Sequence, residues 1–502
     1  MTTVMFVRRF LADYARNPVN LLVLVLVPLV FVVVAAGALA DTARLLGGAG
    51  GGPAVETTTA GWAAGFLAGV AMYFQISAAR DADRRLVIAG LPNTRLVAAR
   101  LLTGLALAAL VSAVALVALT LRTGIDTPAR VAAGTLMFAA IYLAIGAVVG
   151  ATVRNPVNGT VLILFIWIVD VFFGPTLSAA DNVATRVLPT HFVSLWMVDQ
   201  PSHHGGRPGD LGWALSWTMV AALVAFAVVT STTRVAGRRR WHTVPGSVGD
   251  QLGTAMAMGL REWRRNPVLW VLLVVVPAVF ILLSDAITPH GLTPVVLAED
   301  GRRAAELLDP AHIHAGTMAP IAVASLATLT GLFVVLDART GDQRLALAGL
   351  RPGVLLVARL SVIALAALLA TGASLAVTAT VFDAHQWGLY AAATALLAIT
   401  YGLLGVLLGP IFGRVSGVFI AFLIPFLDIG IGQSPMLRGE PADWATYLPG
   451  YGGTRLFIDG ALTASFDETW ALLIALGWLA ALGTAATLLF RHTATARGTV
   501  RR

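Results

Sequence analysis

Long segments without any charged residue dominate this chain of 502 residues. Residues 21–39, 131–149 and 472–490 are uncharged and apolar, and each is longer than the roughly 18 residues that a helix needs to cross a lipid bilayer. Only 12% of the residues are charged, so the chain lacks the polar surface that several soluble domains would require. Because backbone groups in lipid must be satisfied within each segment, the sequence predicts an all-α polytopic membrane protein.

Hydropathy and helix-breaking residues predict about twelve transmembrane helices. Their ranges are 19–40, 60–79, 99–121, 131–153, 156–175, 211–231, 267–287, 316–337, 354–382, 387–412, 415–434 and 470–490. With a cytoplasmic amino terminus, the cytoplasmic segments and helix ends carry 25 of the 34 arginines. Since cytoplasmic loops are enriched in basic residues, this asymmetry predicts that both termini are cytoplasmic and that the protein is multi-pass in the cell (inner) membrane.

The sequence contains an internal repeat. Arg16-Asn17-Pro18-Val19 recurs as Arg265-Asn266-Pro267-Val268, and later markers recur in order: Asp83 as Asp342, Ala99-Arg100-Leu101 as Ala358-Arg359-Leu360, Asp170 as Asp428, and Leu188-Pro189 as Leu448-Pro449. An even number of predicted helices separates each marker from its copy, so the two halves are parallel. We therefore expect a first six-helix half at residues 1–240, a cytoplasmic linker at 241–254 and a second six-helix half at 255–502.

Missing residue types exclude several classes of protein. The chain has no Cys, which excludes disulfides and thiolate sites, and no Lys, which a P-loop needs to reach nucleotide phosphates. No set of nucleophile, base and oxyanion donors is discernible, so we expect no catalytic residues and no cofactor on this chain. The histidine pairs at 203–204 and 312/314 lack further ligands, so we expect no metal. Without a soluble basic face, we expect no nucleic-acid partner.

The triplet Arg-Asn-Pro occurs at 16–18, 154–156 and 265–267, each time before a predicted transmembrane helix. Asn is a good helix N-cap, and Pro is well tolerated at the first helical position. The triplets are therefore interpreted as helix starts.

A short amphipathic stretch precedes the first transmembrane helix of each half. Phe6, Phe10 and Tyr14 recur every four residues, and residues 252–263 repeat this pattern. We expect two elbow helices lying among the lipid headgroups, which include Arg8, Arg9, Phe10, Arg261, Trp263 and Arg264. The simpler alternative is that these arginines only anchor the helix that follows.

The loop between the second and third predicted helices of each half carries charges of both signs. They are Asp81, Asp83, Arg84 and Arg85 in the first half, and Arg339, Asp342 and Arg344 in the second. The general enrichment of basic residues in cytoplasmic loops explains the arginines but not the aspartates. A soluble partner that docks on both loops explains the duplication, so we predict that these residues couple the chain to such a partner.

Two carboxylates lie within predicted transmembrane helices. Asp170 and Asp428 are placed about 20 Å along helices that start in the cytoplasm, which is in the outer half of the bilayer. An ionisable group at that depth is costly unless it is paired or hydrated, so a role in translocation is one hypothesis. The other is that each carboxylate reaches the outer interface or caps the following turn.

The predicted outer segments are less regular. The loops around Leu188-Pro189 and Leu448-Pro449 contain enough apolar residues to re-enter the outer leaflet. Between the first two helices of the second half, residues 294–297 are strand-like and residues 302–308 are helix-like.

The amphipathic helix before the first span, the charged segment between spans two and three, and the long hydrophobic loop between spans five and six together resemble the permease of a type-two ATP-binding-cassette exporter. The resemblance covers the whole chain, once per half, and is closest in kind to the fused form found with drug and polyketide-antibiotic exporters. It implies two ATP-binding-cassette ATPase subunits that bind ATP and Mg in the cytoplasm and contact the elbow helices and the charged loops. It also implies that spans one, two and five line a path for a small hydrophobic substrate, with Asp170, Asp428, Trp167 and Gln75 as candidates.

Export by alternating access, with ATP hydrolysis on a separate chain, is thus what the resemblance implies, and the chain itself is expected not to be an enzyme. The alternative is a proton-coupled secondary multidrug carrier of the major facilitator type, which also has twelve spans in two parallel halves. In that family, glycines normally surround an Asp-Arg core between spans two and three, and residues 80–86 contain no glycine. A membrane-embedded lipid enzyme is a third hypothesis, for which the sequence offers no catalytic set.

Overall fold

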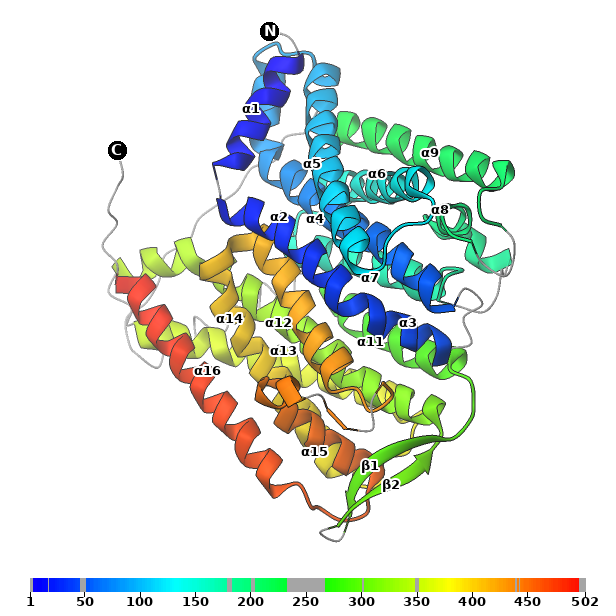
Figure 1. Cartoon of the computed structure of the whole chain (residues 1–502). Coiled ribbons are helices and arrows are strands. Elements are labelled where there is room, and N and C mark those ends of the chain that lie inside the picture. Colours follow the sequence, from blue (N-terminus) through cyan, green and yellow to red (C-terminus); the bar gives the residue numbers. More distant parts are fainter. Residues whose placement is uncertain are drawn as a thin grey trace. The chain divides into compact units, whose positions relative to one another are not determined.

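The structure is a computed structural model that describes residues 3–16, 18–45, 51–177, 183–199, 204–232, 267–299, 302–347, 352–437, 440–441 and 443–495. The chain divides into two compact units, Met1–Arg238 and Arg239–Arg502, and Figure 1 labels the elements of both. The predicted linker at 241–254 and the elbow residues Arg261, Trp263 and Arg264 lie outside the described residues.

The first unit consists of helices. In chain order they are α1 (Thr3–Ala15), α2 (Pro18–Val30), the π-helical segment η1 (Phe31–Ala35), α3 (Ala36–Leu45), α4 (Gly51–Ile88), α5 (Asn93–Arg122), α6 (Pro128–Thr152), α7 (Pro156–Phe173), the 3-10 segment η2 (Val183–Val187), α8 (His191–Met197) and α9 (Pro208–Thr232). α2, η1 and α3 follow one another without a break. Pro28 removes a backbone donor within α2, and the π-helical turn lies just after it, where it accommodates the interrupted hydrogen-bond ladder.

The Arg-Asn-Pro triplets mark helix starts, as predicted. The side-chain oxygen of Asn155 accepts hydrogen bonds from the backbone N–H groups of Val157 and Asn158 at 2.9 and 3.3 Å, and Pro156 is the first residue of α7. A proline at this position loses no hydrogen bond, because the first turn of a helix has no internal partner for its N–H groups. The other two triplets likewise place a proline at the first residue of α2 and of α11.

Glycines bring α4 and α6 into direct backbone contact. Gly69 lies on α4, and Gly146 and Gly150 lie one turn apart on α6. A methyl group at Gly146 would overlap the carbonyl oxygen of Gly69, and one at Gly150 would lie 2.9 Å from the carbonyl oxygen of Tyr73. Small residues allow helices to approach this closely in lipid. The separation between α4 and α6 is therefore fixed by backbone atoms.

The second unit contains a β-hairpin in addition to long helices. Its elements are α11 (Pro267–Ile287), β1 (Thr293–Glu299), β2 (Arg302–Leu308), α12 (Pro310–Leu347), α13 (Pro352–Thr378), α14 (Trp387–Pro425), the π-helical segment η3 (Phe426–Gly432), the 3-10 segment η4 (Asp443–Tyr447), α15 (Gly450–Leu462) and α16 (Thr469–Thr495). Within α14 the backbone of Gly413 is non-helical, with φ 71° and ψ −164°. This kink falls where the sequence predicts the boundary between spans 387–412 and 415–434.

Backbone contact recurs between α12 and α14. A methyl group at Gly405 would overlap the carbonyl oxygen of Thr328, and one at Gly409 would lie 3.1 Å from the carbonyl oxygen of Leu332. Gly331 meets the carbonyl group of Gly402 in the same way. In each unit, backbone contact therefore fixes the spacing between two of the helices that carry the side chains described below.

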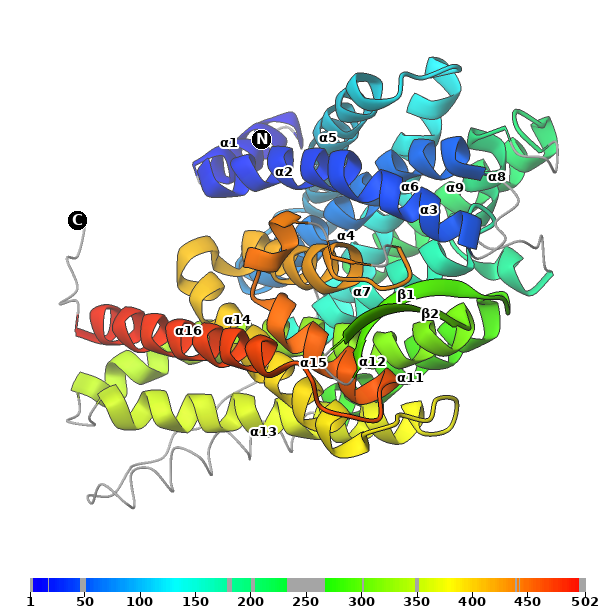
Figure 2. The ribbon, with the colours of Figure 1, turned by 60° about the horizontal axis from the view of Figure 1, so that its bottom comes forward.

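The hairpin corrects one sequence-based expectation. Arg302–Leu308 is a strand rather than a helix, and it pairs antiparallel with β1 from Thr293 opposite Leu308 to Glu299 opposite Arg302. Its Ala, Arg and Leu residues favour a helix, but a seven-residue segment is too short to sustain one alone. The ladder supplies its hydrogen-bond partners instead, and β1 contacts α15, beside which the hairpin lies in Figure 2.

Ten helices in the described residues are long and apolar enough to cross a membrane. α11 adds a shorter apolar stretch, Val271–Ala286, and one of the ten, Trp387–Gly432, contains the Gly413 kink. The predicted multi-pass helical architecture is thus confirmed, with the hairpin as an addition. The count of about twelve helices, the parallel arrangement of two halves and the cytoplasmic position of both termini stay predictions.

Candidate functional site

A buried ion pair holds the charged segment between α4 and α5. Asp83, near the end of α4, accepts hydrogen bonds from Nε and Nη2 of Arg100 on α5 at 3.1 and 2.8 Å. Only 7% of the Asp83 side chain and 12% of the Arg100 side chain are exposed. Two parallel hydrogen bonds between a guanidinium and a carboxylate fix orientation as well as distance. The pair therefore determines where the end of α4 lies against α5.

Arg100 also connects this segment to the elbow helix. Its guanidinium carbon lies 3.7 Å from the centre of the Phe10 ring of α1, which is a cation–π contact. α1 packs against α5, as Figure 1 shows, while Arg8 and Arg9 are exposed. The hydroxyl of Tyr14, on the same helix, is buried, and this burial raises the pKa of Tyr14 to about 12. Contacts thus run from α1 through α5 to α4.

Other arginines at the end of α4 bind the carboxyl ends of neighbouring helices. Arg80 donates to the carbonyl oxygens of Gly150 and Val153 at the end of α6. Arg84 donates to the carbonyl oxygen of Thr232, the last residue of α9, at 3.4 Å. Carbonyl groups at a helix C-terminus lack internal partners and carry partial negative charge, so guanidinium groups stabilise them. We call this end of each unit, where the Asp–Arg pair lies, the loop end.

The second unit contains the equivalent pair. Asp342 on α12 accepts hydrogen bonds from Nε and Nη2 of Arg359 on α13 at 3.3 and 2.8 Å, and the Asp342 side chain is 6% exposed. Arg339 is exposed, and the side chain of Arg344 lies outside the described residues. In both units, an arginine of the following helix forms an ion pair with the aspartate. Neither carboxylate is therefore free at the surface, and the prediction that Asp83 and Asp342 couple the chain to a partner stays a prediction.

Residues next to the buried pair of the first unit are exposed. The side chain of Asp81 is 86% exposed, Ile88 is 84% exposed, and Arg85 is also exposed. Gly90 has φ 93°, a left-handed conformation that ends the helix and turns the chain toward α5. Asp81, Arg85 and Ile88 form a surface that we call the α4 tip. It combines charges of both signs with one apolar side chain on a helix end that the Asp83–Arg100 pair holds against α5.

At the opposite end of the first unit, Asp170 on α7 is buried and hydrogen-bonded. Its Oδ2 accepts from the hydroxyl groups of Tyr142 at 2.8 Å and Thr190 at 2.6 Å, and its Oδ1 accepts from the Thr190 backbone N–H at 3.3 Å. Tyr142 lies on α6, and Thr190 immediately precedes α8. Asp170 is buried, with 3% of its surface exposed. It joins α6, α7 and the start of α8.

Asp428 in η3 makes equivalent contacts in the second unit. Its Oδ2 accepts from the hydroxyl of Tyr401 on α14 and from the N–H of Gly450 at 2.8 Å, and its Oδ1 accepts from Nε2 of Gln433 at 3.2 Å. Gly450 is the first residue of α15, and Asp428 is 1% exposed. Each aspartate therefore bonds a tyrosine of a long helix and the start of a short helix. The role of Asp170 and Asp428 in translocation stays a prediction.

Trp167, predicted to line the translocation path, is buried, and its contacts join three helical elements. Its ring N–H donates to the carbonyl oxygen of Trp62 at 2.9 Å. The ring packs against Phe66 of α4 and edge-on against Phe31 of η1, with centroid distances of 5.1 and 6.0 Å. It therefore ties α7 to α4 and η1.

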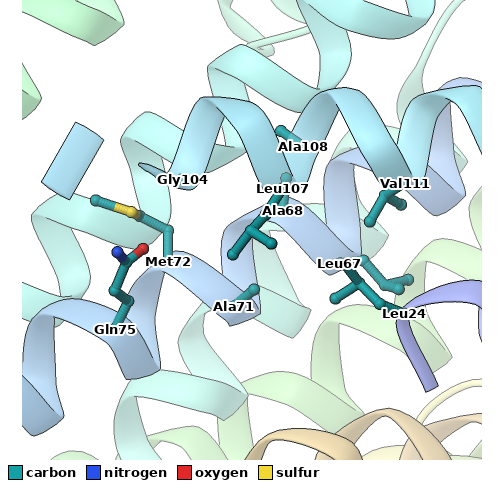
Figure 3. Close-up of a pocket in the computed structure, with 10 residues that line it drawn as sticks. All are labelled: Leu24, Leu67, Ala68, Ala71, Met72, Gln75, Gly104, Leu107, Ala108 and Val111. Carbon is teal, nitrogen blue, oxygen red and sulfur yellow. The ribbon is translucent and has the colours of Figure 1, made fainter. Parts of the chain in front are cut away.

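Gln75, the other path candidate, lies in a narrow crevice between α2, α4 and α5. In Figure 3, Gln75 lies at one end, and Leu24 and Val111 lie at the other. The lining is otherwise apolar, and the crevice is too narrow to admit a water molecule. Oε1 of Gln75 is buried without a hydrogen-bond partner in the part of the chain that the structure describes. The role of Gln75 in a translocation path stays a prediction.

Four residues that make these contacts are not among the candidates predicted from the sequence: Arg100, Arg359, Tyr142 and Tyr401. The two arginines carried a usable signal, because each recurs at the same distance after its aspartate. The tyrosines did not, since a tyrosine in an apolar helix gives no indication of the carboxylate that it contacts on another helix.

The histidines considered as metal ligands have local partners. His204 Nδ1 lies 2.9 Å from Asp210 Oδ2, and His314 Nδ1 lies 2.7 Å from the Thr288 hydroxyl. Within the described ranges, no three potential metal ligands lie together.

Comparison with known families adds one match. Residues 60–230 match the family described as ABC-2 family transporter protein, a range that extends from α4 to α9 and contains the α4 tip, the Asp83–Arg100 pair and Asp170. No curated protein matches the chain. The family match supports an ABC-2 type permease. Permeases of this family are multi-pass transport subunits without a nucleotide-binding domain, and the family implies association with ATP-binding-cassette ATPases. It does not favour the major facilitator alternative.

Proposed function

We propose that this chain is the permease of an ATP-driven exporter, with two six-helix halves fused in one polypeptide of the cell (inner) membrane. It moves a hydrophobic or amphipathic compound, such as a drug, an antibiotic or a lipid, outward by alternating access. Two ATPase subunits docked at the loop ends bind ATP and Mg, since this chain has no lysine for a P-loop. The family match over residues 60–230 carries the proposal.

The contacts within each unit support coupling from the loop end to the opposite end. In the first unit, α4 runs unbroken from Gly51 to Ile88, so a force on the α4 tip moves the whole helix. The contact between Gly69 and Gly146 makes α6 move with α4. α6 in turn carries Tyr142, which binds Asp170 at the opposite end. A docked ATPase can thus act on the far end of the unit through two rigid helices.

Reconstitution with the partner tests the proposed energy source. In liposomes the purified chain alone is expected to accumulate no amphipathic fluorescent dye against a gradient. Addition of the ATPase encoded beside it, with Mg-ATP, is expected to produce accumulation that vanadate abolishes. The matched control is an ATPase whose P-loop lysine is replaced, which binds but does not drive transport. Accumulation driven by a pH gradient without any ATPase would overturn the proposal in favour of a proton-coupled carrier.

Charge reversal at the exposed surface tests the docking site. Arg85→Glu combined with Arg339→Glu is expected to weaken ATPase binding about tenfold or more, because both side chains are exposed at the loop ends and charges at an interface rim control association. Binding is measured on the purified chain in nanodiscs at low and high salt. Arg207→Glu, an exposed arginine at the start of α9, is the control and should bind as the unmodified chain does. Equal binding by all three proteins would place docking elsewhere.

A further inference from the structure

A short buried helix lies at the end opposite the loop end in each unit. α8 packs against α6 and α9, and its Val193, Leu195 and Met197 are buried. α15 packs against α14 and α16, and Gly452 lies so close to the backbone of Ala471 that no side chain would fit. Both helices are therefore inserted between longer helices rather than lying on the surface.

In each unit, a buried aspartate forms hydrogen bonds with the start of the short helix. Asp170 accepts hydrogen bonds from the hydroxyl and the backbone N–H of Thr190, which immediately precedes α8. Asp428 accepts a hydrogen bond from the backbone N–H of Gly450 at the start of α15. Free N–H groups at a helix start carry partial positive charge, so a carboxylate stabilises them. The described residues form no salt bridge with either aspartate, and all of the contacts described are donated to the carboxylate. Asparagine cannot reproduce this pattern, because its amide nitrogen is a donor.

The remaining partner of each carboxylate lies on a helix that the loop end can move. Tyr142 is on α6, which contacts α4 through glycine backbone, and Tyr401 is on α14, which contacts α12 in the same way. A shift of α6 or α14 by one or two ångströms would lengthen the hydroxyl contact beyond hydrogen-bond distance. The two units contain the same three-part connection although their outer segments differ.

We propose that Asp170 and Asp428 are positioning residues of two latches, which hold α8 and α15 inserted at rest and release them when α6 and α14 move. The latches close the end of each unit opposite the ATPase docking surface. The role of this closure in export rests on the proposed function. The hydrogen bonds that hold α8 and α15 can be tested without a transport assay.

Because the chain has no native cysteine, single reporters can be labelled without background. Ser194→Cys in α8 and Thr454→Cys in α15 place a thiol of similar size at positions that are 2% and 1% exposed. Thr103→Cys, in the first half of α5 and 1% exposed, is the matched reporter outside the two short helices. The full-length chain in lipid nanodiscs is reacted with a membrane-impermeant maleimide, which reaches both faces, and the labelling rate is measured.

Asp170→Asn is expected to raise the labelling rate of Ser194→Cys about tenfold or more, because local opening becomes less costly, and to leave Thr103→Cys unchanged. Asp428→Asn should do the same for Thr454→Cys. Tyr142→Phe and Tyr401→Phe remove one of the contacts and should give smaller increases with a fully folded chain. Tyr73→Phe removes a hydroxyl that donates to Asn155 at the loop end and is the control without effect on Ser194→Cys.

Unchanged labelling of the α8 and α15 reporters in all four variants would overturn the latch, as would an equal rise at Thr103→Cys, which indicates general loosening. Adding the ATPase and Mg-ATP to the otherwise unmodified reporters separates the two proposals. If labelling rises in the Asp variants but ATP drives no transport in the unmodified chain, the latch stands and the proposed function fails. If ATP drives transport while the Asp variants label like the unmodified chain, the proposed function stands and the latch fails.

Discussion

Replacing Arg100 with alanine is expected to lower ATP-driven transport at least about tenfold while the chain still inserts in the membrane. The substitution leaves Asp83 buried without its partner, and breaking one side of a buried ion pair typically costs about 3–5 kcal/mol. It also removes the contact with Phe10, so the α4 tip loses its fixed position relative to both α5 and the elbow helix. Vanadate-sensitive dye accumulation in liposomes that contain the ATPase measures the effect.

The double variant Asp83→Ala/Arg100→Ala separates the pair from the general loss of a side chain. Removal of both charges leaves no unpaired group, so thermal stability should recover relative to either single variant, whereas transport should stay low because the loop is no longer fixed. Arg95→Ala, an exposed arginine in the first turns of α5, is the control and should behave as the unmodified chain does. Normal transport by Arg100→Ala, or identical stability of the single and double variants, would show that the pair does not position the loop.

Replacing Gly146 with alanine is expected to destabilise the first unit by about 1–3 kcal/mol or more, although alanine is the better helix former by about 1 kcal/mol. The added methyl group overlaps the carbonyl oxygen of Gly69, and backbone atoms cannot rotate away as a flexible side chain can. α4 and α6 must therefore move apart. Gly405→Ala should have the same effect through Thr328 in the second unit. Thermal unfolding of the purified chain in detergent, with the aggregated fraction measured by gel filtration, gives the comparison.

Two other glycines provide controls for this result. A methyl group at Gly212 in α9 or Gly372 in α13 would meet no atom within 4 Å. Gly212→Ala and Gly372→Ala should therefore be neutral or slightly stabilising, because only helix propensity changes. If Gly146→Ala and Gly212→Ala unfold at the same temperature, α4 and α6 are not in backbone contact and the proposed transmission from the loop end to Asp170 is not supported.

Local sequence was sufficient to place most helices. The predicted span at 267–287 agrees with α11, and the prediction at 156–175 differs from α7 only at its carboxyl end. Asn155 and Pro156 identify a helix start because capping depends on residues only a few positions apart. α4 and α12 extend beyond the predicted spans at 60–79 and 316–337, because hydropathy detects the part of a helix in lipid and not its polar continuation.

The amino-acid sequence by itself determined that this chain is a multi-pass helical membrane protein with recurring Asp, Arg and Leu-Pro markers, because hydrophobic length and capping are local properties. Only the tertiary structure decided what the aspartates do. Asp83 pairs with Arg100, Asp170 binds Tyr142 and Thr190, and Arg302–Leu308 becomes a strand, each through a partner on another element. A buried charge is stabilised by whichever donor the packing of helices brings to it, and that packing depends on close backbone contacts between residues distant in the chain.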